Sequence, residues 1–300
     1  MSLFSTLLTN GGYACYCLGR VYNDHKEWSN KLTDSLEQLN IYRADNCADW
    51  NNYLSVSTFK RNSRRCESNV KEVKRLYVDM DAHDNPINED EAKLLSDYMM
   101  LNWFDGEELP EPNYVIFSGR GLQFLFTIDG CDNVPEWKQY QTALLKSCQK
   151  LLEDLKHHSL SEVSVVALEH DVSIDDLKDA ARVMRVPDTT NLKVNVDAKL
   201  LYSNEQHEYT LDELSTNYTS FSKDNLPTIE EKKKTQKKTK SKDKKKKVKS
   251  EPSERDVDLS GIDMNEKQGI DPHFFEIIEK TIKPRLSDLC LLYTSPSPRD

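Results

Sequence analysis

Long apolar runs and targeting signals are both missing from this sequence of 300 residues. No stretch approaches the roughly 20 consecutive apolar residues that a membrane-spanning helix requires. The amino terminus reads Met-Ser-Leu-Phe-Ser-Thr-Leu-Leu-Thr-Asn and has neither the basic region nor the apolar region of a secretory signal peptide. We therefore expect a cytoplasmic protein with no membrane partner.

Cysteine pairs at redox or metal-binding spacing are also missing. The seven cysteines, an odd number, stand at positions 15, 17, 47, 66, 131, 148 and 290. None forms a Cys-x-x-Cys pair, and no histidine spacing completes a zinc site. We expect reduced thiols that are buried or incidental.

The net charge of −10 is unevenly distributed along the chain. Residues 231–250 contain twelve lysines and two acidic residues, a net charge of +10, so the remaining 280 residues carry −20. This tract lacks the apolar residues needed to bury a core, which predicts a disordered linker over residues 226–255. We expect a folded domain over residues 1–225 before it and the start of a helical module over residues 256–289 after it.

The last eleven residues, 290–300, read Cys-Leu-Leu-Tyr-Thr-Ser-Pro-Ser-Pro-Arg-Asp and match one reading frame of a transposase-type sequencing adapter. Eleven consecutive codons in one frame are hard to reach by chance. We therefore expect an adapter-derived segment that interrupts the helical module and is excluded from fold reasoning.

The remaining chain is interpreted around residues 76–81, Leu-Tyr-Val-Asp-Met-Asp. Apolar residues alternate with Asp79 and Asp81, a period of two that predicts a half-buried strand. Both carboxylates then project from one face and repel each other unless a cation neutralises them. Mg²⁺ prefers such oxygen ligands, and carboxylates about 7 Å apart can hold two ions roughly 3.5–4 Å apart. An acidic strand end that meets solvent is the alternative interpretation.

A glycine-rich turn, Ser118-Gly119-Arg120-Gly121, lies between two apolar segments and predicts a β-hairpin over residues 113–128. Backbone N–H groups, a hydroxyl and a guanidinium are groups that bind a triphosphate, although an ordinary hairpin turn is the alternative. Gln123 alternates away from its apolar neighbours and is expected on the face that meets a ligand.

Three cations lie close together in residues 171–193: Arg182 and Arg185, three residues apart, and then Lys193. Cations that follow a strand-end carboxylate suit a triphosphate paired with a metal ion. The alternative is a surface segment whose Asp and Arg residues form salt bridges.

Other periodicities complete the prediction of a mixed α/β (α+β) fold. They indicate strands over 53–59, 163–168 and 194–202 and a loop over 40–49. They also indicate helices over 135–156 and 211–214, a helix that begins at a capping box of Asn88 and Glu91 and ends at about 103, and helical spacing at Trp28, Leu32 and Leu36.

Together these stretches resemble the archaeo-eukaryotic primase superfamily, in particular the RepB-like primase-polymerases of plasmids and mobile elements. The Asp-x-Asp strand of that family is matched by Asp79 and Asp81, and its Ser-Gly-x-Gly hairpin by residues 118–123. Its third motif is matched at Asp179, Arg182, Arg185, Pro187, Thr189, Asn191 and Lys193, with Asp188 in place of the usual Gly. The resemblance covers roughly residues 50–215.

The resemblance implies a primase-polymerase core with an RRM-like sheet. It implies nucleotidyl transfer from an NTP or dNTP to a primer 3′-hydroxyl on a single-stranded DNA template, with a helicase domain or protein as a further candidate partner. Mg²⁺ or Mn²⁺ would be held by three carboxylates, assigned to Asp79, Asp81 and Asp171, with Asp175 as the second choice. The nucleotide-binding residues would be Ser118, Gly119, Arg120, Gly121, Gln123, Arg182, Arg185 and Lys193.

Two other classes stay open. A glycosyltransferase also uses Asp-x-Asp to hold a metal ion and a nucleotide, but it predicts neither the hairpin nor the arginine stretch. A replication initiator or DNA-binding protein with a decayed polymerase core is supported by Gln123, which cannot carry a charge as His can, and by Asp188.

Overall fold

The computed structural model describes residues 3–8, 12–22, 25–61, 63–82, 85–104, 106–158, 161–205, 207–222 and 224–227. All of them belong to one compact unit that spans residues 1–243. The predicted linker beyond residue 227, the helical module over 256–289 and the segment 290–300 lie outside the described residues. None of the helices in the described ranges is long and apolar enough to cross a membrane.

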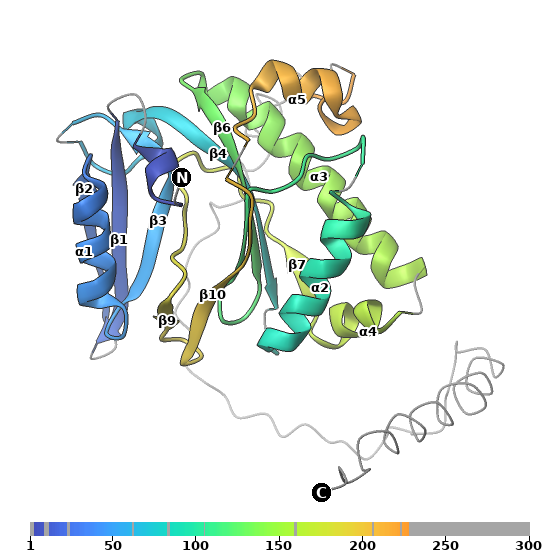
Figure 1. The fold of residues 1–300 in the computed structure, drawn as a ribbon, viewed down its shortest axis with the longest axis horizontal. Helices are drawn as coiled ribbons and strands as arrows, with labels where there is room; N and C mark the ends of the chain where they lie inside the picture. Colours follow the sequence, from blue (N-terminus) through green and yellow to red (C-terminus); the bar gives the residue numbers. More distant parts are fainter. Residues whose placement is uncertain are drawn as a thin grey trace, which may run out of the picture. The chain divides into compact units, whose positions relative to one another are not determined.

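The fold is a mixed α+β domain built on one ten-stranded antiparallel sheet, which confirms the predicted fold class (Figure 1). The strands are β1 Tyr13–Tyr22, β2 His25–Thr33, β3 Asn51–Phe59, β4 Val70–Ala82, β5 Tyr114–Phe117, β6 Leu122–Cys131, β7 Val172–Ile174, β8 Val183–Arg185, β9 Thr189–Asn191 and β10 Val196–Ser203. The helices are α1 Leu36–Asn46, α2 Glu89–Asn102, α3 Val134–His158, α4 Glu162–Glu169 and α5 Leu211–Asn217, with short 3-10 turns at Ser5–Leu7, Glu67–Asn69 and Thr219–Phe221.

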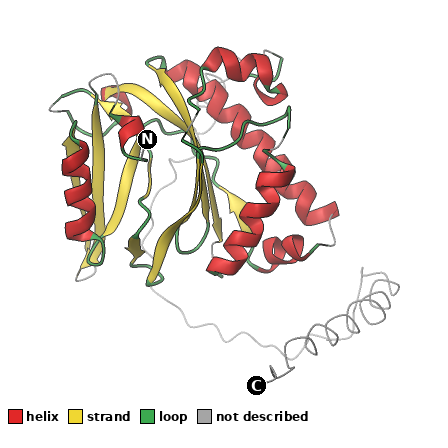
Figure 2. Ribbon diagram, in the orientation of Figure 1, coloured by secondary structure: helices red, strands yellow, loops and turns green. Residues whose placement is uncertain are grey.

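The strand order is β2-β1-β3-β4-β6-β5-β10-β9, with β7 paired to β4 and β8 paired to β3. Helices α2, α3, α4 and α5 gather on one side of β4, β5 and β6, and α1 lies beside β1 (Figure 2). Helix α3 is amphipathic and buries one face, on which Trp137, Leu144 and Cys148 are fully enclosed.

Neighbouring strands β3 and β4 pair only over a short distance and then separate. Direct pairing covers Ser57–Phe59 of β3. Further along, β8 pairs with β3 and β7 pairs with β4, so the chain between residues 171 and 186 fills the gap. The sheet also curls, because Thr190 of β9 donates its N–H to the carbonyl of Cys47 at 2.8 Å, just before β3 begins.

Side chains of α3 supply hydrogen bonds where β4 has left β3. The fully buried Gln141 accepts from the N–H of Tyr77 at 3.1 Å and donates to its carbonyl at 2.7 Å. The indole N–H of Trp137 donates to the carbonyl of Arg75 at 3.1 Å. Because a buried backbone group without a partner is costly, these bonds allow β4, which stays paired with β6 on its other side, to continue without a strand on the side that β3 has left.

Most predicted elements are confirmed, including the strands β3, β4, β5, β6 and β10, the helices α3 and α5, and the capping box at Asn88 and Glu91 that begins α2. The helical spacing of Trp28, Leu32 and Leu36 was misleading. The first two lie in β2, whose pairing with β1 overrides the spacing, and α1 begins only after the cap at Ser35. The loop predicted over 40–49 is therefore mostly helix.

The strand predicted over residues 163–168 is instead the helix α4. The Ser161 side chain caps it by accepting from the N–H of Ser164 at 3.3 Å. Val163, Val166 and Ala167 are buried, which is helical spacing. A short apolar run does not by itself distinguish a strand from a buried helix.

Gln141→Leu should lower the free energy of unfolding by about 2–4 kcal/mol, because a donor and an acceptor of β4 would be left buried and unpaired. Chemical denaturation followed by circular dichroism measures the change. Gln149→Leu is the matched control on α3, because Gln149 is partly exposed and makes one bond, at 3.3 Å to the carbonyl of Ile174. Equal losses in the two variants would contradict this role for Gln141.

Candidate active site

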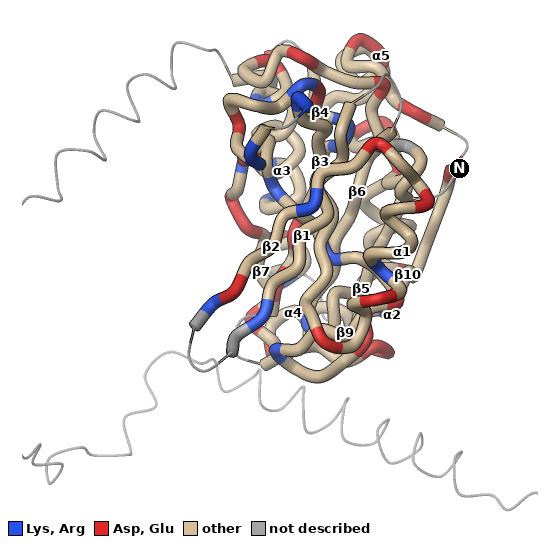
Figure 3. The backbone as a smooth tube through the Cα atoms, turned by 90° about the vertical axis from the view of Figure 1, so that its left-hand side faces the viewer, with Lys and Arg blue, Asp and Glu red and all other residues tan. Residues whose placement is uncertain are grey.

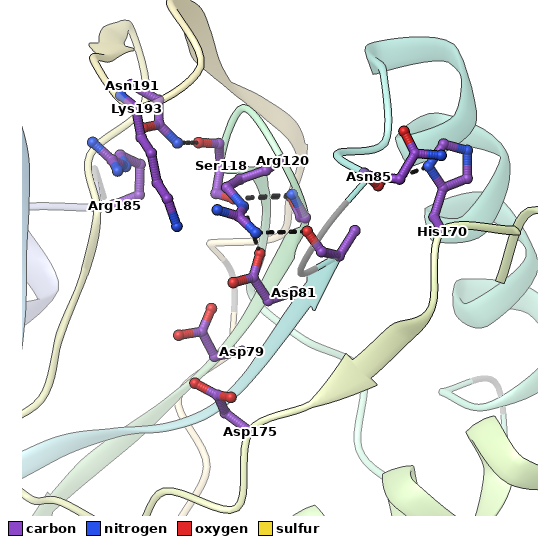
Figure 4. A network of polar contacts seen from close by, with 12 residues as sticks. Asp79, Asp81, Asn85, Ser118, Arg120, His170, Asp175, Arg185, Asn191 and Lys193 are labelled. Carbon is purple, nitrogen blue, oxygen red and sulfur yellow. Dashed lines mark hydrogen bonds and ion pairs between the residues drawn. The ribbon is translucent and has the colours of Figure 1, made fainter. Parts of the chain in front are cut away.

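The carboxylates of Asp79 and Asp81 project from the same face of β4, as their spacing predicted (Figure 4). Asp79 accepts hydrogen bonds from Nε2 of Gln123 at 3.0 Å and from Arg182 at 2.6 Å. Asp81 accepts from Nε of Arg120 at 3.0 Å. The two aspartate side chains are 17% and 33% exposed, so both remain accessible to a ligand.

The turn between β5 and β6 closes tightly against the end of β4. The N–H of Ser118 donates to the carbonyl of Gly121 at 2.9 Å, and Gly119 has a φ of 90°, in the region that favours glycine. A Cβ atom on Gly121 would lie 2.1 Å from the carbonyl oxygen of Met80. Glycine is therefore required at position 121 for the hairpin to reach the carboxylate strand.

Arg120, at the tip of this turn, is directed to β4 (Figure 4). Besides its bond to Asp81, its guanidinium donates to the carbonyl of Ala82 at 2.7 Å, and the residue is only 7% exposed. Arg120 therefore holds Asp81 in position.

Gln123 uses both ends of its amide to connect three strands. Nε2 donates to Asp79 on β4, which is its register partner, and Oε1 accepts from the N–H of Arg185 on β8 at 2.9 Å. The side chain thus fixes the orientation of the Asp79 carboxylate. It faces the site rather than the core, as the alternation of residues 122–126 predicted.

A third carboxylate, Asp175, lies beside Asp79 at the end of β7 (Figure 4). Its N–H donates to the carbonyl of Asp79 at 3.0 Å. Arg182 lies between the two side chains, 2.6 Å from Oδ2 of Asp79 and 3.3 Å from Oδ2 of Asp175. The strand β7 therefore delivers a carboxylate to the site through its pairing with β4.

The predicted third carboxylate, Asp171, does not accompany Asp79 in this geometry. Its side chain is 84% exposed and its ion-pair partner is Lys156, at 4.0 Å. Because the segment 163–168 is a helix, the strand that follows it is β7, which begins only after Asp171 and ends just before Asp175. The second choice, Asp175, is the carboxylate that accompanies Asp79.

The loop between Asp175 and Arg182 is fastened to β4 by Tyr77. The Tyr77 hydroxyl donates to the carbonyl of Leu177 at 3.1 Å and accepts from the N–H of Asp179 at 3.2 Å. Burial raises the pKa of the Tyr77 hydroxyl, so it stays protonated and able to donate. The Asp179 carboxylate serves the loop itself, because it accepts from the N–H of Ala181 at 2.8 Å.

Two arginines of the third motif have different surroundings. Burial by itself would lower the pKa of Arg182, but the charge and hydrogen bond of Asp79 outweigh this effect and raise it. Burial lowers the pKa of Arg185. The guanidinium carbon of Arg185 lies 4.5 Å from the ring centroid of Tyr53, and the guanidinium donates a hydrogen bond to the Asn51 side chain at 2.9 Å. Both side chains remain cationic at neutral pH, because the pKa of an arginine starts from a high value.

A cavity of about 570 Å³ lies over these groups. Its lining residues come from both ends of the curled sheet and are Gly19, Arg20, Lys26, Trp28, Asn51, Tyr53, Asp79, Asp81, Ser118, Arg120, Gln123, Arg185, Asn191, Leu192 and Lys193. The Lys193 side chain points towards the carboxylates, and its amine makes no ion pair within the described part of the chain (Figure 4). The site residues predicted on β4, β6 and β8 and in the two turns therefore lie together.

The sequence analysis missed the contribution of the β1–β2 hairpin. Arg20, Lys26 and Trp28 line the cavity although they lie outside the three motifs. The β-prone segment 13–22, followed directly by Asn-Asp, was the signal that could have found this hairpin.

His170, at the end of α4, fixes the segment that follows the carboxylate strand (Figure 4). Its Nδ1 lies 2.8 Å from the carbonyl oxygen of Asn85, and its Nε2 lies 3.2 Å from Oε1 of Glu91. Since Glu91 also belongs to the cap of α2, this histidine joins three elements behind the site.

Gly121→Ala should destabilise the domain by about 3 kcal/mol, because the added methyl group would meet the backbone of β4 rather than a flexible side chain. Thermal unfolding measures the loss. Gly106→Ala is the control, since a Cβ there has no neighbour within 4 Å. If both variants unfold at the wild-type temperature, the close approach of the hairpin to β4 is wrong.

No family model matches this chain. It is 29% identical over 190 residues to a curated replication protein from Clostridium perfringens, an alignment that covers 63% of this chain. The chain spans only 38% of the length of that relative.

The solved structures to which the chain is similar include two primases. One is the AEP domain of the cyanophage S-2L primase-polymerase, with a TM-score of 0.46 and 11% identity, covering 71% of this chain and 92% of that one. Another is the primase RepB′, with a TM-score of 0.36 and 13% identity, covering 79% of this chain and 65% of that one. In sequence, the chain is thus similar to a replication protein.

Proposed function

We propose that this domain is a nucleotidyltransferase of a replication protein, a primase-polymerase that adds nucleotides from an NTP or dNTP to a primer 3′-hydroxyl on a DNA template. One observation carries the proposal. The carboxylates of Asp79 and Asp81 open into the same cavity that Arg185 and Lys193 line. Negative groups for a metal ion and positive groups for phosphates are thereby combined in one site. The sequence similarity to a replication protein supports the same conclusion.

The donor set fits a hard divalent cation, Mg²⁺ or Mn²⁺, that is shared with a substrate. Within the described residues, no group of three or more His, Cys, Asp or Glu side chains is placed to hold a metal ion by itself. Mg²⁺ is commonly bound by one or two carboxylates together with substrate phosphates, which is what Asp79 and Asp81 offer. When bound, such an ion lowers the pKa of an attacking hydroxyl and neutralises charge on the leaving pyrophosphate.

The remaining residues of the site supply positive charge for the triphosphate and position the two carboxylates. Lys193 and Arg185 offer positive charge to the triphosphate, and Ser118 of the 118–121 turn lines the same cavity. Gln123 and Arg120 hold the two carboxylates in position. These are contributions of binding and electrostatics, which account for most of the catalysis of phosphoryl transfer.

Arg182 forms ion pairs with two carboxylates of the site. It contacts Asp79 and Asp175 together, so a cation that arrives at Asp79 competes with it. If a cation bound at Asp79 replaced Arg182 as its partner, the Arg182 guanidinium would be available to a phosphate, as the third motif implies. In this proposal Arg182 links the filling of the metal site to the binding of the nucleotide.

A non-catalytic replication initiator is the second candidate. It is favoured by one observation, namely that Arg182 and Arg120 already neutralise Asp79 and Asp81. This candidate predicts DNA binding without nucleotide incorporation in any divalent metal, whereas the primase-polymerase predicts incorporation.

Asp79→Asn and Asp81→Asn should each reduce nucleotide incorporation by about 100-fold or more, because a neutral amide is a poor ligand for a hard cation. A primer-extension assay with Mg²⁺ or Mn²⁺ measures the loss, and circular dichroism checks the fold. Asp97→Asn, on the exposed face of α2, is the control. Near-normal incorporation by either site variant would remove these residues from the site.

Asp175→Asn and Asp171→Asn form a matched pair that tests which of the two residues is the third carboxylate. Asp175→Asn should lower incorporation by about 10-fold or more, because its carboxylate lies beside Asp79 and holds Arg182. Asp171→Asn should leave incorporation unchanged, since that carboxylate is 84% exposed and, within the described residues, its ion-pair partner is Lys156 at 4.0 Å. The reverse order of effects would restore Asp171 as the third carboxylate.

A further inference from the structure

Trp28 is an exposed aromatic residue in a charged cavity. It is 54% exposed, whereas Trp103 and Trp137 are buried. It lies on β2 and lines the cavity that also contains Asp79 and Asp81. An exposed indole in such a place contributes little to the core, and a large exposed apolar surface in a binding hollow marks a place of contact.

The backbone of β1 allows this indole to lie flat across the sheet. Trp28 stands opposite Gly19 in the β1–β2 register, and a Cβ atom on Gly19 would lie 3.0 Å from the indole ring. The ring passes over the glycine and reaches Tyr53 on β3, with ring centroids 5.7 Å apart and planes inclined by 30°. Arg185 lies 4.5 Å from the centroid of the same Tyr53 ring. An aromatic surface thus runs from the edge of the sheet to the arginine of the site.

Basic residues accompany this aromatic surface on the same hairpin. Lys26 is two residues from Trp28 on β2, so both side chains lie on one face, and both line the cavity. Arg20 of β1 lines it too, but its guanidinium is paired with Glu27 at 2.7 Å, so Lys26 is the cation that accompanies the indole. Figure 3, which views this side of the molecule, shows basic positions on both β1 and β2. Aromatic rings for bases combined with cations for a backbone are the elements of a single-strand binding surface.

We propose that Trp28 stacks on a base of single-stranded DNA, the template strand, and that Lys26 contacts a neighbouring phosphate. The proposal deepens the function proposed above and rests on it. A strand, rather than the incoming nucleotide, is favoured because Trp28 lies on β2, the edge strand of the sheet, and remains half-exposed. A ligand that continues beyond the cavity explains an indole placed at its rim.

The test measures binding of a fluorescein-labelled thymidine oligonucleotide of about 12 nucleotides to the full chain by anisotropy, without metal or nucleotide. Stacking contributes about 1–3 kcal/mol per base, so Trp28→Ala should weaken binding by about 5-fold to 100-fold. Trp28→Phe should recover most of the affinity. An oligonucleotide of the same length with abasic sites should bind wild type and Trp28→Ala equally, because it has no base to stack.

Lys26→Ala provides the complementary variant. It should weaken binding to the normal and the abasic strand alike and reduce the salt dependence by about 0.7 in slope, the value of one phosphate contact on a single strand. Thermal unfolding of each variant shows whether the fold is intact. Unchanged affinity of folded Trp28→Ala, or an equal loss on normal and abasic strands, overturns the proposal. Quenching of indole fluorescence by dTTP alone, without an effect of the oligonucleotide, also overturns it and assigns the surface to the incoming nucleotide.

The failure of this proposal is distinguishable from the failure of the proposed function. If wild type extends primers but Trp28→Ala binds template normally, only the stacking surface is wrong. If Trp28 supports base-dependent binding but no template is extended with Mg²⁺ or Mn²⁺, the surface stands and the catalytic function falls.

Discussion

The separation of β3 from β4 is the constraint on which the site depends. Two paired strands that part inside a sheet expose N–H and carbonyl groups that must find other partners. On β4 those partners are Gln141 and Trp137 from α3, and then β7. On β3 the partner is β8. The chain between β7 and β8 thereby brings Asp175 and Arg182 to Asp79, so the same segment that satisfies the backbone also completes the site.

Ion pairs offset the repulsion among the acidic groups that lie in the gap between β3 and β4. Each aspartate of β4 has its own arginine, and Arg182 serves Asp175 as well as Asp79. Removing an arginine from such a cluster leaves uncompensated charge, whereas replacing it with another cation does not. The charges of the site are therefore balanced by its own residues. Lys193 at the rim adds a charge that no carboxylate among the described residues neutralises by an ion pair.

Sequence patterns predicted the elements that depend mainly on residues adjacent in sequence. The period of two at residues 76–81, the turn at 118–121 and the capping box at Asn88 each depend on neighbours in sequence, and each is found as predicted. Local patterns did not show that Asp175, rather than Asp171, lies beside Asp79, because that position depends on how β7 pairs with β4. The β1–β2 hairpin was missed for a similar reason, because only its pairing shows that Trp28 belongs to a strand. The motifs gave the chemistry of the site, and tertiary pairing decided which residues share it.

The central claim is that Asp79 and Asp81 hold a divalent cation jointly with the phosphates of a nucleotide. A titration of Mn²⁺ followed by electron paramagnetic resonance, with and without a non-hydrolysable dNTP analogue, tests it most directly. We expect the protein alone to bind Mn²⁺ weakly. In the presence of protein and analogue together, Mn²⁺ should bind at least about ten-fold more tightly than it binds to the analogue alone in solution, because carboxylates and phosphates then share the ion. The gain should disappear in Asp79→Asn. Mn²⁺ that binds equally well without the analogue, or a gain that survives in Asp79→Asn, would contradict the account.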